Sequence, residues 1–335
     1  MRAKKKRSLL PPIIALGFMI GSIFGCAASE QNLWGGNKRG DLSPQKLRQM
    51  REDRILSDDS PLIRESSISY DSSAAKKLPE MTGDELEMSG DAFLEKGNLP
   101  MAFVQYEKFL RLDPENARVH YKKGLTLLLG KMNEDAVEAF QSAVKIDTEC
   151  APAYGGAGQA FFQMRRYDEA EVNFRKAVKL DPSLWKSHNF LGIICDYKKR
   201  YKEAVQEYSA AILLMPDEGL LYNNLGMAFL MTGEYEKAAN AFYKALEAGY
   251  SRNRVYNNLG LVLSKSGRYK EAMEAFRKGS DRARANNNMG CVYLAQGEFE
   301  KAAGCFTKAI EIKPSFYVRA SENLRKAKTG CGRLR

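Results

Sequence analysis

Seven glycines recur along this chain at a nearly constant interval, and this periodicity limits its fold more than any other feature. The first five intervals equal that from Gly90 to Gly124, and the last is four positions shorter. An alanine follows each glycine at a fixed offset, as Ala102 follows Gly90, and an aromatic residue follows each alanine by four positions. A fixed period of this length indicates a stack of structural repeats rather than one globular core. The glycines are Gly90, Gly124, Gly158, Gly192, Gly226, Gly260 and Gly290; the aromatic residues are Tyr106, Phe140, Phe174, Tyr208, Phe242, Phe276 and Phe306.

The residue types in the pattern predict a hairpin of two antiparallel helices in each repeat. The glycine and the alanine are small enough to let the two helices approach closely where they cross. The aromatic ring is expected to fill the space toward the next hairpin. Prolines follow the second helix in four copies, where they stop it and begin the connection to the next repeat. These prolines are Pro114, Pro182, Pro216 and Pro314.

This pattern resembles the tetratricopeptide repeat (TPR) and covers residues 83–316. The resemblance implies an all-α solenoid, a right-handed superhelix of seven hairpins with a concave groove along the first helices. Residues 317–328 are expected to form a capping helix with Ala320 and Leu324 facing inward, and the tail from Thr329 to Arg335 is expected to fray. The sixth repeat is four residues short, about one helical turn. We expect its second helix to lose its last turn around 278–282, with a compressed loop between intact helices as the alternative.

The N-terminus has the features of an export signal. Residues 1–25 combine five basic residues with an apolar run from 9 to 24 that is too short for a typical membrane-spanning helix. The sequence from Ile23 to Cys26 resembles a bacterial lipobox, although Phe24 is larger than usual. This resemblance implies acylation of Cys26 and, with Ala27 following, an outer-membrane location facing the periplasm. An ordinary signal peptide with a coincidental cysteine is the alternative. Residues 26–82 are expected to form a disordered linker.

The net charge of the chain does not indicate a nucleic-acid partner. It falls from +11 to +6 when the five basic residues of 1–25 are removed, and no acidic residue lies in that segment. A charge of this size is ordinary for the remaining length.

No constellation of residues predicts an enzyme, a cofactor or a metal site. The sequence holds two histidines, His120 and His188, each four residues before a repeat glycine, where a role in helix packing is expected. It contains no HExxH, no CxxC pair and no glycine-rich phosphate loop. Besides Cys26 there are five cysteines, an odd number that argues against a disulfide framework. A disulfide between Cys291 and Cys305, within the seventh hairpin, remains open.

Asparagines recur on the first helices, on the side expected to line the groove. Asparagine is a mediocre helix former, so its repeated use suggests a role for the amide. An amide both donates and accepts hydrogen bonds and can hold an extended peptide, and a nearby arginine can bind carboxylates. Alternatively, the amides cap or bridge neighbouring helices. The candidate peptide-binding residues are Asn189, Asn223, Asn224, Asn257, Asn258, Asn287 and Asn288, with Arg254 and Arg284.

The combination of export signal, lipobox and repeats resembles the lipoproteins that assemble tight-adherence (Tad, or Flp) pili. Asn257–Gly260 and the run 320–327 add to the resemblance. It implies an anchored scaffold that assists a pilus or secretion complex, with an outer-membrane secretin or a pilus component as partner. An adaptor for other envelope machinery, such as exopolysaccharide export or peptidoglycan enzymes, is the alternative. A non-catalytic domain of an envelope hydrolase is a third possibility, but no segment outside the repeats is large enough for the catalytic domain.

Overall fold

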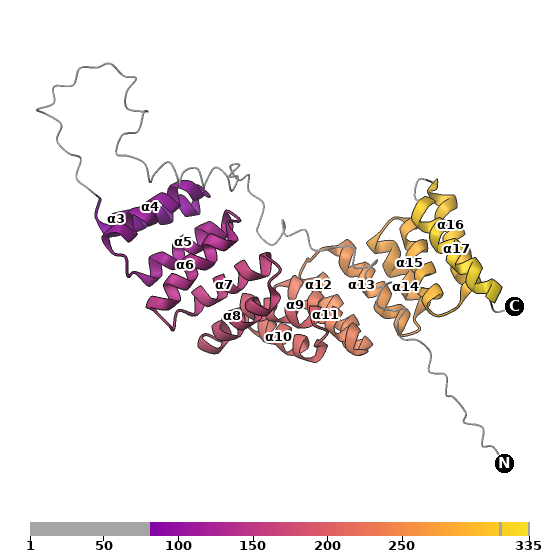
Figure 1. The fold of residues 1–335 in the computed structure, drawn as a ribbon. Coiled ribbons are helices and arrows are strands. Elements are labelled where there is room, and N and C mark those ends of the chain that lie inside the picture. The colour runs from indigo at the N-terminus through magenta and orange to yellow at the C-terminus, as the bar shows by residue number, and fades with distance from the viewer. Residues whose placement is uncertain (1–80, 315–316, 334–335) are drawn as a thin grey trace, which may run out of the picture. The chain divides into compact units, whose positions relative to one another are not determined.

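The computed structural model describes residues 81–314 and 317–333, and its fifteen elements are all α-helices, as Figure 1 shows. By their internal contacts these residues divide into a long unit that ends at Gly279 and a C-terminal unit that begins at Ser280. The expected all-α repeat fold is therefore confirmed. The expected signal peptide (1–25), Cys26 and nearly all of the linker lie outside the described residues.

Consecutive helices pair into hairpins throughout both units. The hairpins of the long unit are α3 (Gly83–Glu95) with α4 (Leu99–Leu112), α5 (Ala117–Leu129) with α6 (Asn133–Ile146), α7 (Ala151–Gln163) with α8 (Tyr167–Leu180), α9 (Trp185–Tyr197) with α10 (Tyr201–Leu214), α11 (Gly219–Thr232) with α12 (Tyr235–Glu247), and α13 (Arg252–Lys265) with α14 (Tyr269–Gly279). The C-terminal unit contains α15 (Arg282–Ala295), α16 (Phe299–Ile312) and α17 (Tyr317–Arg333). Within the described ranges, none of the helices combines the length and the apolar character needed to cross a membrane.

The turn inside each hairpin reverses the chain through one residue with a left-handed backbone. In the first hairpin this residue is Gly97, with φ of 71°, and the next amide, Asn98 N–H, donates to the Phe93 carbonyl at 2.8 Å. That bond closes a Schellman motif, which caps the first helix and starts the turn. Three hairpins place a side chain at this position, where only glycine is unstrained. These residues are Lys131, Arg165 and Lys199, with φ near 60°.

The core of each hairpin is built on the contact between the repeat glycine and the repeat aromatic ring. A Cβ atom on Gly124 would lie 2.7 Å from Cδ1 of Phe140, closer than side-chain carbons approach each other. The same ring lies against the next hairpin, where a Cβ on Gly156 would lie 2.4 Å from its Cζ. Phe140 is completely buried. The ring thus joins its own hairpin to the following one, as the sequence pattern predicts.

The short sixth repeat combines both of the expected alternatives. Its second helix, α14, is two to three residues shorter than the second helices of the other hairpins. The connection from α14 to α15 is also short, with two residues where four connect the other hairpins. Gly279 allows this early end because a Cβ there would lie 2.8 Å from the Asn253 carbonyl oxygen. The missing residues are therefore shared between the helix and the loop.

The capping helix α17 is longer than expected. Ala320 is buried as predicted, and Leu324 packs against the cluster that contains Phe306. The tail does not fray at Thr329, because the helix continues to Arg333. Gly330 lets this extra turn lie directly on the ring of Phe299, since a Cβ there would lie 2.4 Å from the ring.

No disulfide joins Cys291 and Cys305 in the structure. Instead, the side-chain amide of Asn323 on α17 lies 3.6 Å from Sγ of Cys291.

Candidate functional site

The nine predicted groove residues all lie on first helices, namely α9, α11, α13 and α15. Asn287 and Asn288 lie on α15 in the C-terminal unit, and we call the five asparagines of the long unit (189, 223, 224, 257 and 258) the asparagine surface. The seven asparagines fall into two classes by burial. Asn189, Asn223 and Asn287 are buried, whereas Asn224, Asn257, Asn258 and Asn288 are half-buried. Arg254 and Arg284 are exposed.

In the long unit, hydrogen bonds between amides join the first helices of neighbouring hairpins. Asn224 donates from Nδ2 to Oδ1 of Asn189 at 3.2 Å, which links α11 to α9. One repeat later, Asn258 donates to Oδ1 of Asn223 at 3.0 Å, which links α13 to α11. In both pairs the half-buried amide donates and the buried amide accepts. The bridging role that the sequence left open is therefore present in the structure.

Asn257 holds its own hairpin together. Its Nδ2 donates to the Asn253 carbonyl at 2.9 Å and to the Gly279 carbonyl at 3.1 Å. The second bond satisfies a carbonyl at the end of α14, where the helix provides no partner of its own. This amide thus compensates for the early end of the sixth repeat.

The C-terminal unit contains a bridge that the sequence analysis missed. Asn323 on α17 donates from Nδ2 to Oδ1 of Asn287 on α15 at 3.3 Å. The capping helix therefore takes the place of a further first helix, and this unit has an amide bridge of the same kind. The signal was present in the sequence, because Asn323 follows Asn287 by about one repeat.

A bridged asparagine keeps hydrogen-bonding capacity for a ligand. The side-chain amide has two N–H donors and two acceptor lone pairs, and one bridge uses only one donor. Arg254 adds a guanidinium whose Nη1 lies 3.2 Å from the Tyr250 hydroxyl, and Arg284 lies 3.7 Å from Asp281. Both arginines remain exposed. The arrangement can therefore serve for bridging and for binding a peptide backbone or a carboxylate.

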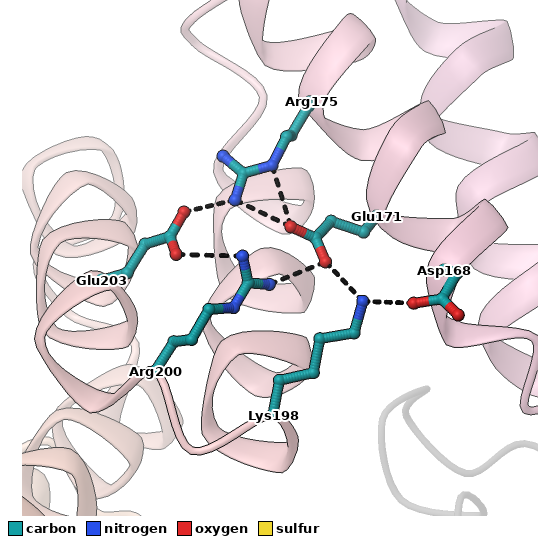
Figure 2. A network of polar contacts seen from close by, with 6 residues as sticks. All are labelled: Asp168, Glu171, Arg175, Lys198, Arg200 and Glu203. Carbon is teal, nitrogen blue, oxygen red and sulfur yellow. Dashed lines mark hydrogen bonds and ion pairs between the residues drawn. The ribbon is translucent and has the colours of Figure 1, made fainter.

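A separate network of charges joins α8 to the next hairpin, as Figure 2 shows. Glu171, which is buried, accepts hydrogen bonds from Arg200 at 2.7 Å, from Lys198 at 2.8 Å and from Arg175 at 2.8 Å. Burial alone would raise the pKa of this carboxyl, but the three cations hold it at about 2. Asp168 and Glu203 complete the network, so three carboxylates face three cations. With its charges balanced internally, the network fastens two repeats and does not form a site for a charged ligand.

His188 joins the two helices of its hairpin. His188 on α9 lies 2.7 Å from Oε2 of Glu207 through Nδ1 and 3.2 Å from the Pro182 carbonyl through Nε2. The hydrogen bond to Glu207 raises the pKa of His188 although burial opposes this shift. Across the residues described, no cluster of three or more His, Cys, Asp or Glu side chains is placed to hold a metal ion.

Comparison with known families finds repeats of one kind along the chain. One family model, described as tetratricopeptide repeat, matches residues 151–184 and 283–316. Another with the same description matches residues 200–253 and 223–286. A third, described as TPR repeat, matches residues 90–130. A search of curated proteins finds no match.

Solved structures with similar folds cover about half or more of the chain. YrrB, described as a TPR protein with an unusual peptide-binding site, is 20% identical with a TM-score of 0.51, covering 57% of this chain and 97% of its own. MamA is 29% identical with a TM-score of 0.45, covering 48% of this chain and 94% of its own. A tetratricopeptide repeat protein from Parabacteroides merdae is 18% identical with a TM-score of 0.49. The match covers 73% of this chain and 98% of that protein. The likeness to YrrB shows the fold alone.

Proposed function

Because the chain belongs to the tetratricopeptide-repeat family, whose members act as protein-binding scaffolds, we propose that it binds a protein segment through the asparagine surface. We further propose that it is anchored through acylated Cys26 to the outer membrane and assists assembly of a pilus or secretion complex without catalytic activity. The partner in this proposal is a secretin or a pilus component.

The single observation that carries the binding proposal is the pair of inter-repeat amide bridges in the long unit. Each bridge fixes the side chain of a half-buried asparagine, Asn224 or Asn258, in one orientation. Fixing the amide in advance lowers the entropy that binding must overcome, and its second N–H is still available. The bridges recur with the repeat, so successive amides can bind successive groups of an extended backbone.

The anchor proposal rests on residues 1–26 and on general membrane physics. Each buried methylene of an acyl chain contributes about 0.8 kcal/mol, so two or three chains on one cysteine hold a protein stably at a bilayer. An adaptor for exopolysaccharide export or peptidoglycan enzymes would use the same anchor and the same surface, and it differs only in the identity of the partner.

The binding proposal is tested with substitutions on the two sides of one bridge. Asn224→Ala removes a half-buried amide, whereas Asn189→Ala breaks the same bridge by removing its buried acceptor. Binding of the co-purified partner is expected to fall with Asn224→Ala and with the combined Asn224, Asn258 and Asn288 alanine variant, and to fall much less with Asn189→Ala. Equal losses from both sides of the bridge, together with a loss of helicity, would mean that the amides act on the fold alone. Partner binding unchanged in the triple variant, with helicity intact, would refute the proposal.

The anchor and the partner are tested together by purification from mildly solubilised membranes. Co-purifying proteins are identified by mass spectrometry for the wild type and for Cys26→Ser. A secretin or pilus subunit that accompanies the wild type and is lost with the variant is the expected result. Cell-wall or polysaccharide enzymes in its place would move the assignment to the alternative machinery. Soluble fractionation of both forms with the same partners would show that Cys26 is not an anchor.

A further inference from the structure

The first and the last described helices each expose a side that is covered in the other repeats. Val119 of α5 is completely buried and packs with the first hairpin. Its counterpart 34 positions earlier is Glu85 of α3, which is exposed. Thr126 of α5 is also buried, whereas its counterpart Ala92 is exposed. The side of α3 that a preceding hairpin would cover is therefore open within the described part of the chain.

The last helix, α17, leaves open the side that a second helix covers in each hairpin. Asn323, the donor of its amide bridge, takes the place that Asn224 takes on α11. In this register Arg325 stands where Gly226 stands, two residues after the donor. A Cβ on Gly226 would lie 2.8 Å from the ring of Phe242, so that glycine is in direct contact with α12. Arg325 is instead exposed, and this side of α17 has no such cover among the described residues.

The open side of α3 is acidic. Its positions recur three or four residues apart, as Met88, Ala92 and Glu95 do, which places them on one face of the helix. The exposed charged residues on this side are three carboxylates and one cation, with a net charge of −2, namely Asp84, Glu85, Glu95 and Lys96. None of the three carboxylates forms an ion pair with another described residue. Between them, Met88 is 65% exposed.

The open side of α17 is basic. Its exposed charged residues are three cations and one carboxylate, with a net charge of +2, namely Arg325, Lys326, Lys328 and Glu322. None of the three cations forms an ion pair with another described residue. Val318 lies on the same face, seven positions before Arg325, and is 71% exposed. The surroundings reinforce the sign, since residues 280–335 hold eleven basic and five acidic residues, whereas residues 81–279 hold 27 of each.

We propose that the basic side of α17 binds the acidic side of α3 in a second copy of this chain. Two acidic or two basic sides would repel each other, so the contact joins unlike sides. Because each copy has one side of each kind, the contact is heterologous and repeats from copy to copy. A solenoid needs polar end faces for solubility whatever their sign, so solubility alone does not account for the opposite charges. The contact includes no residue of the asparagine surface and therefore adds self-association to the proposed binding of a partner.

The proposal is tested by reversing the charge of each side separately in the full chain. The α17 variant carries Arg325→Glu, Lys326→Glu and Lys328→Glu. The α3 variant carries Asp84→Lys, Ala92→Lys and Glu95→Lys, and it keeps Glu85 because that carboxylate accepts from the Thr82 amide at 2.8 Å and caps the helix. Association is measured by sedimentation velocity in non-ionic detergent. The wild type is expected to form species larger than one copy, and its association should weaken at least about tenfold from about 50 mM to about 500 mM salt, because exposed charges are screened.

Mixing the two variants tests whether the two sides meet each other. Each variant alone has two sides of the same sign, so neither should self-associate. In an equimolar mixture the acidic α3 of one variant meets the basic α17 of the other, and association should return. A matched control with Lys145→Glu, Lys179→Glu and Lys202→Glu reverses three exposed cations on second helices and should associate like the wild type. Unchanged helicity shows that the fold of each variant is intact.

Four outcomes would overturn the proposal. A wild type that stays a single copy at low salt would remove the contact, and association that persists in both variants would place it elsewhere in the chain. Loss of association in the α17 variant alone would mean that the basic side meets a different anionic group. Variants that remain single copies when mixed would mean that the two sides do not meet. Because the test changes neither Cys26 nor any asparagine of the first helices, its failure is distinguishable from failure of the proposed function.

Discussion

Two glycine-to-alanine substitutions in the last hairpin should differ clearly in their effect on its stability. Gly290 lies inside α15, where an added Cβ would lie 2.6 Å from Cε1 of the fully buried Phe306. Gly304 lies on the exposed side of α16, where an added Cβ would meet no atom within 4 Å. Both changes gain helix propensity, worth about 1 kcal/mol within a helix. Only Gly290→Ala also overpacks the core, which costs about 1–3 kcal/mol.

The propensity term is common to both variants, so the difference between them isolates the cost of overpacking. Gly304→Ala should stabilise the hairpin by about 1 kcal/mol, and Gly290→Ala should fall about 1–3 kcal/mol below it. Repeat arrays need not unfold in a single step, so the measurement is amide hydrogen exchange resolved to peptides from 282–312. Equal stabilisation by both variants would show that the Phe306 ring moves freely aside and would refute the steric account of the repeat.

Three further predictions follow from single side chains. Lys131→Gly should stabilise the fold by roughly 1 kcal/mol, because Lys131 has a left-handed backbone with φ of 62°. The midpoint of urea unfolding should therefore rise, and an unchanged midpoint would mean that the turn is unstrained. Glu207→Gln should lower the pKa of His188, which the hydrogen bond to Glu207 raises. A histidine whose pKa is raised by folding stabilises the folded state at pH values below its unfolded pKa, which is near 6.5. This contribution disappears as the pH rises through the folded pKa. Glu207→Gln should therefore lower the free energy of unfolding, measured by urea titration, more at pH 5 than at pH 9. Burial raises the pKa of Asp196 to about 7, so the charged form is disfavoured in the folded state. Asp196→Asn should therefore stabilise at pH 8 and lose this gain below about pH 4; a gain that is the same at both pH values would contradict the assignment.

The hairpins were predictable because the repeat is dictated by sterics between residues close in sequence. A glycine and the aromatic ring that follows it within one repeat can meet only if the chain reverses between them, and seven such pairs leave little choice of fold. The end of α17 was not predictable on the same basis. The tail was expected to fray from Thr329 as chain termini usually do, but in the structure Gly330 lets the helix approach Phe299.

The positions of the candidate residues in the fold could be predicted only in part. The register placed the asparagines correctly on the first helices, but it could not separate the buried acceptors, such as Asn189, from the half-buried donors, such as Asn224. That distinction depends on the lateral offset between neighbouring hairpins, which no single repeat encodes.

The amide bridges also bear on how such an array can change in length. Asn224 donates to the residue 35 positions earlier, and Asn258 does the same. If one full-length repeat were duplicated in this part of the chain, the copied Asn224 would again follow an asparagine by 35 positions. The new junction between hairpins would then have the same amide bridge. Gene duplication could therefore insert a repeat without evolving a new interface. The sixth repeat is four residues shorter than the others, so a copy of it would change the spacing of 35 positions and remove the amide bridge.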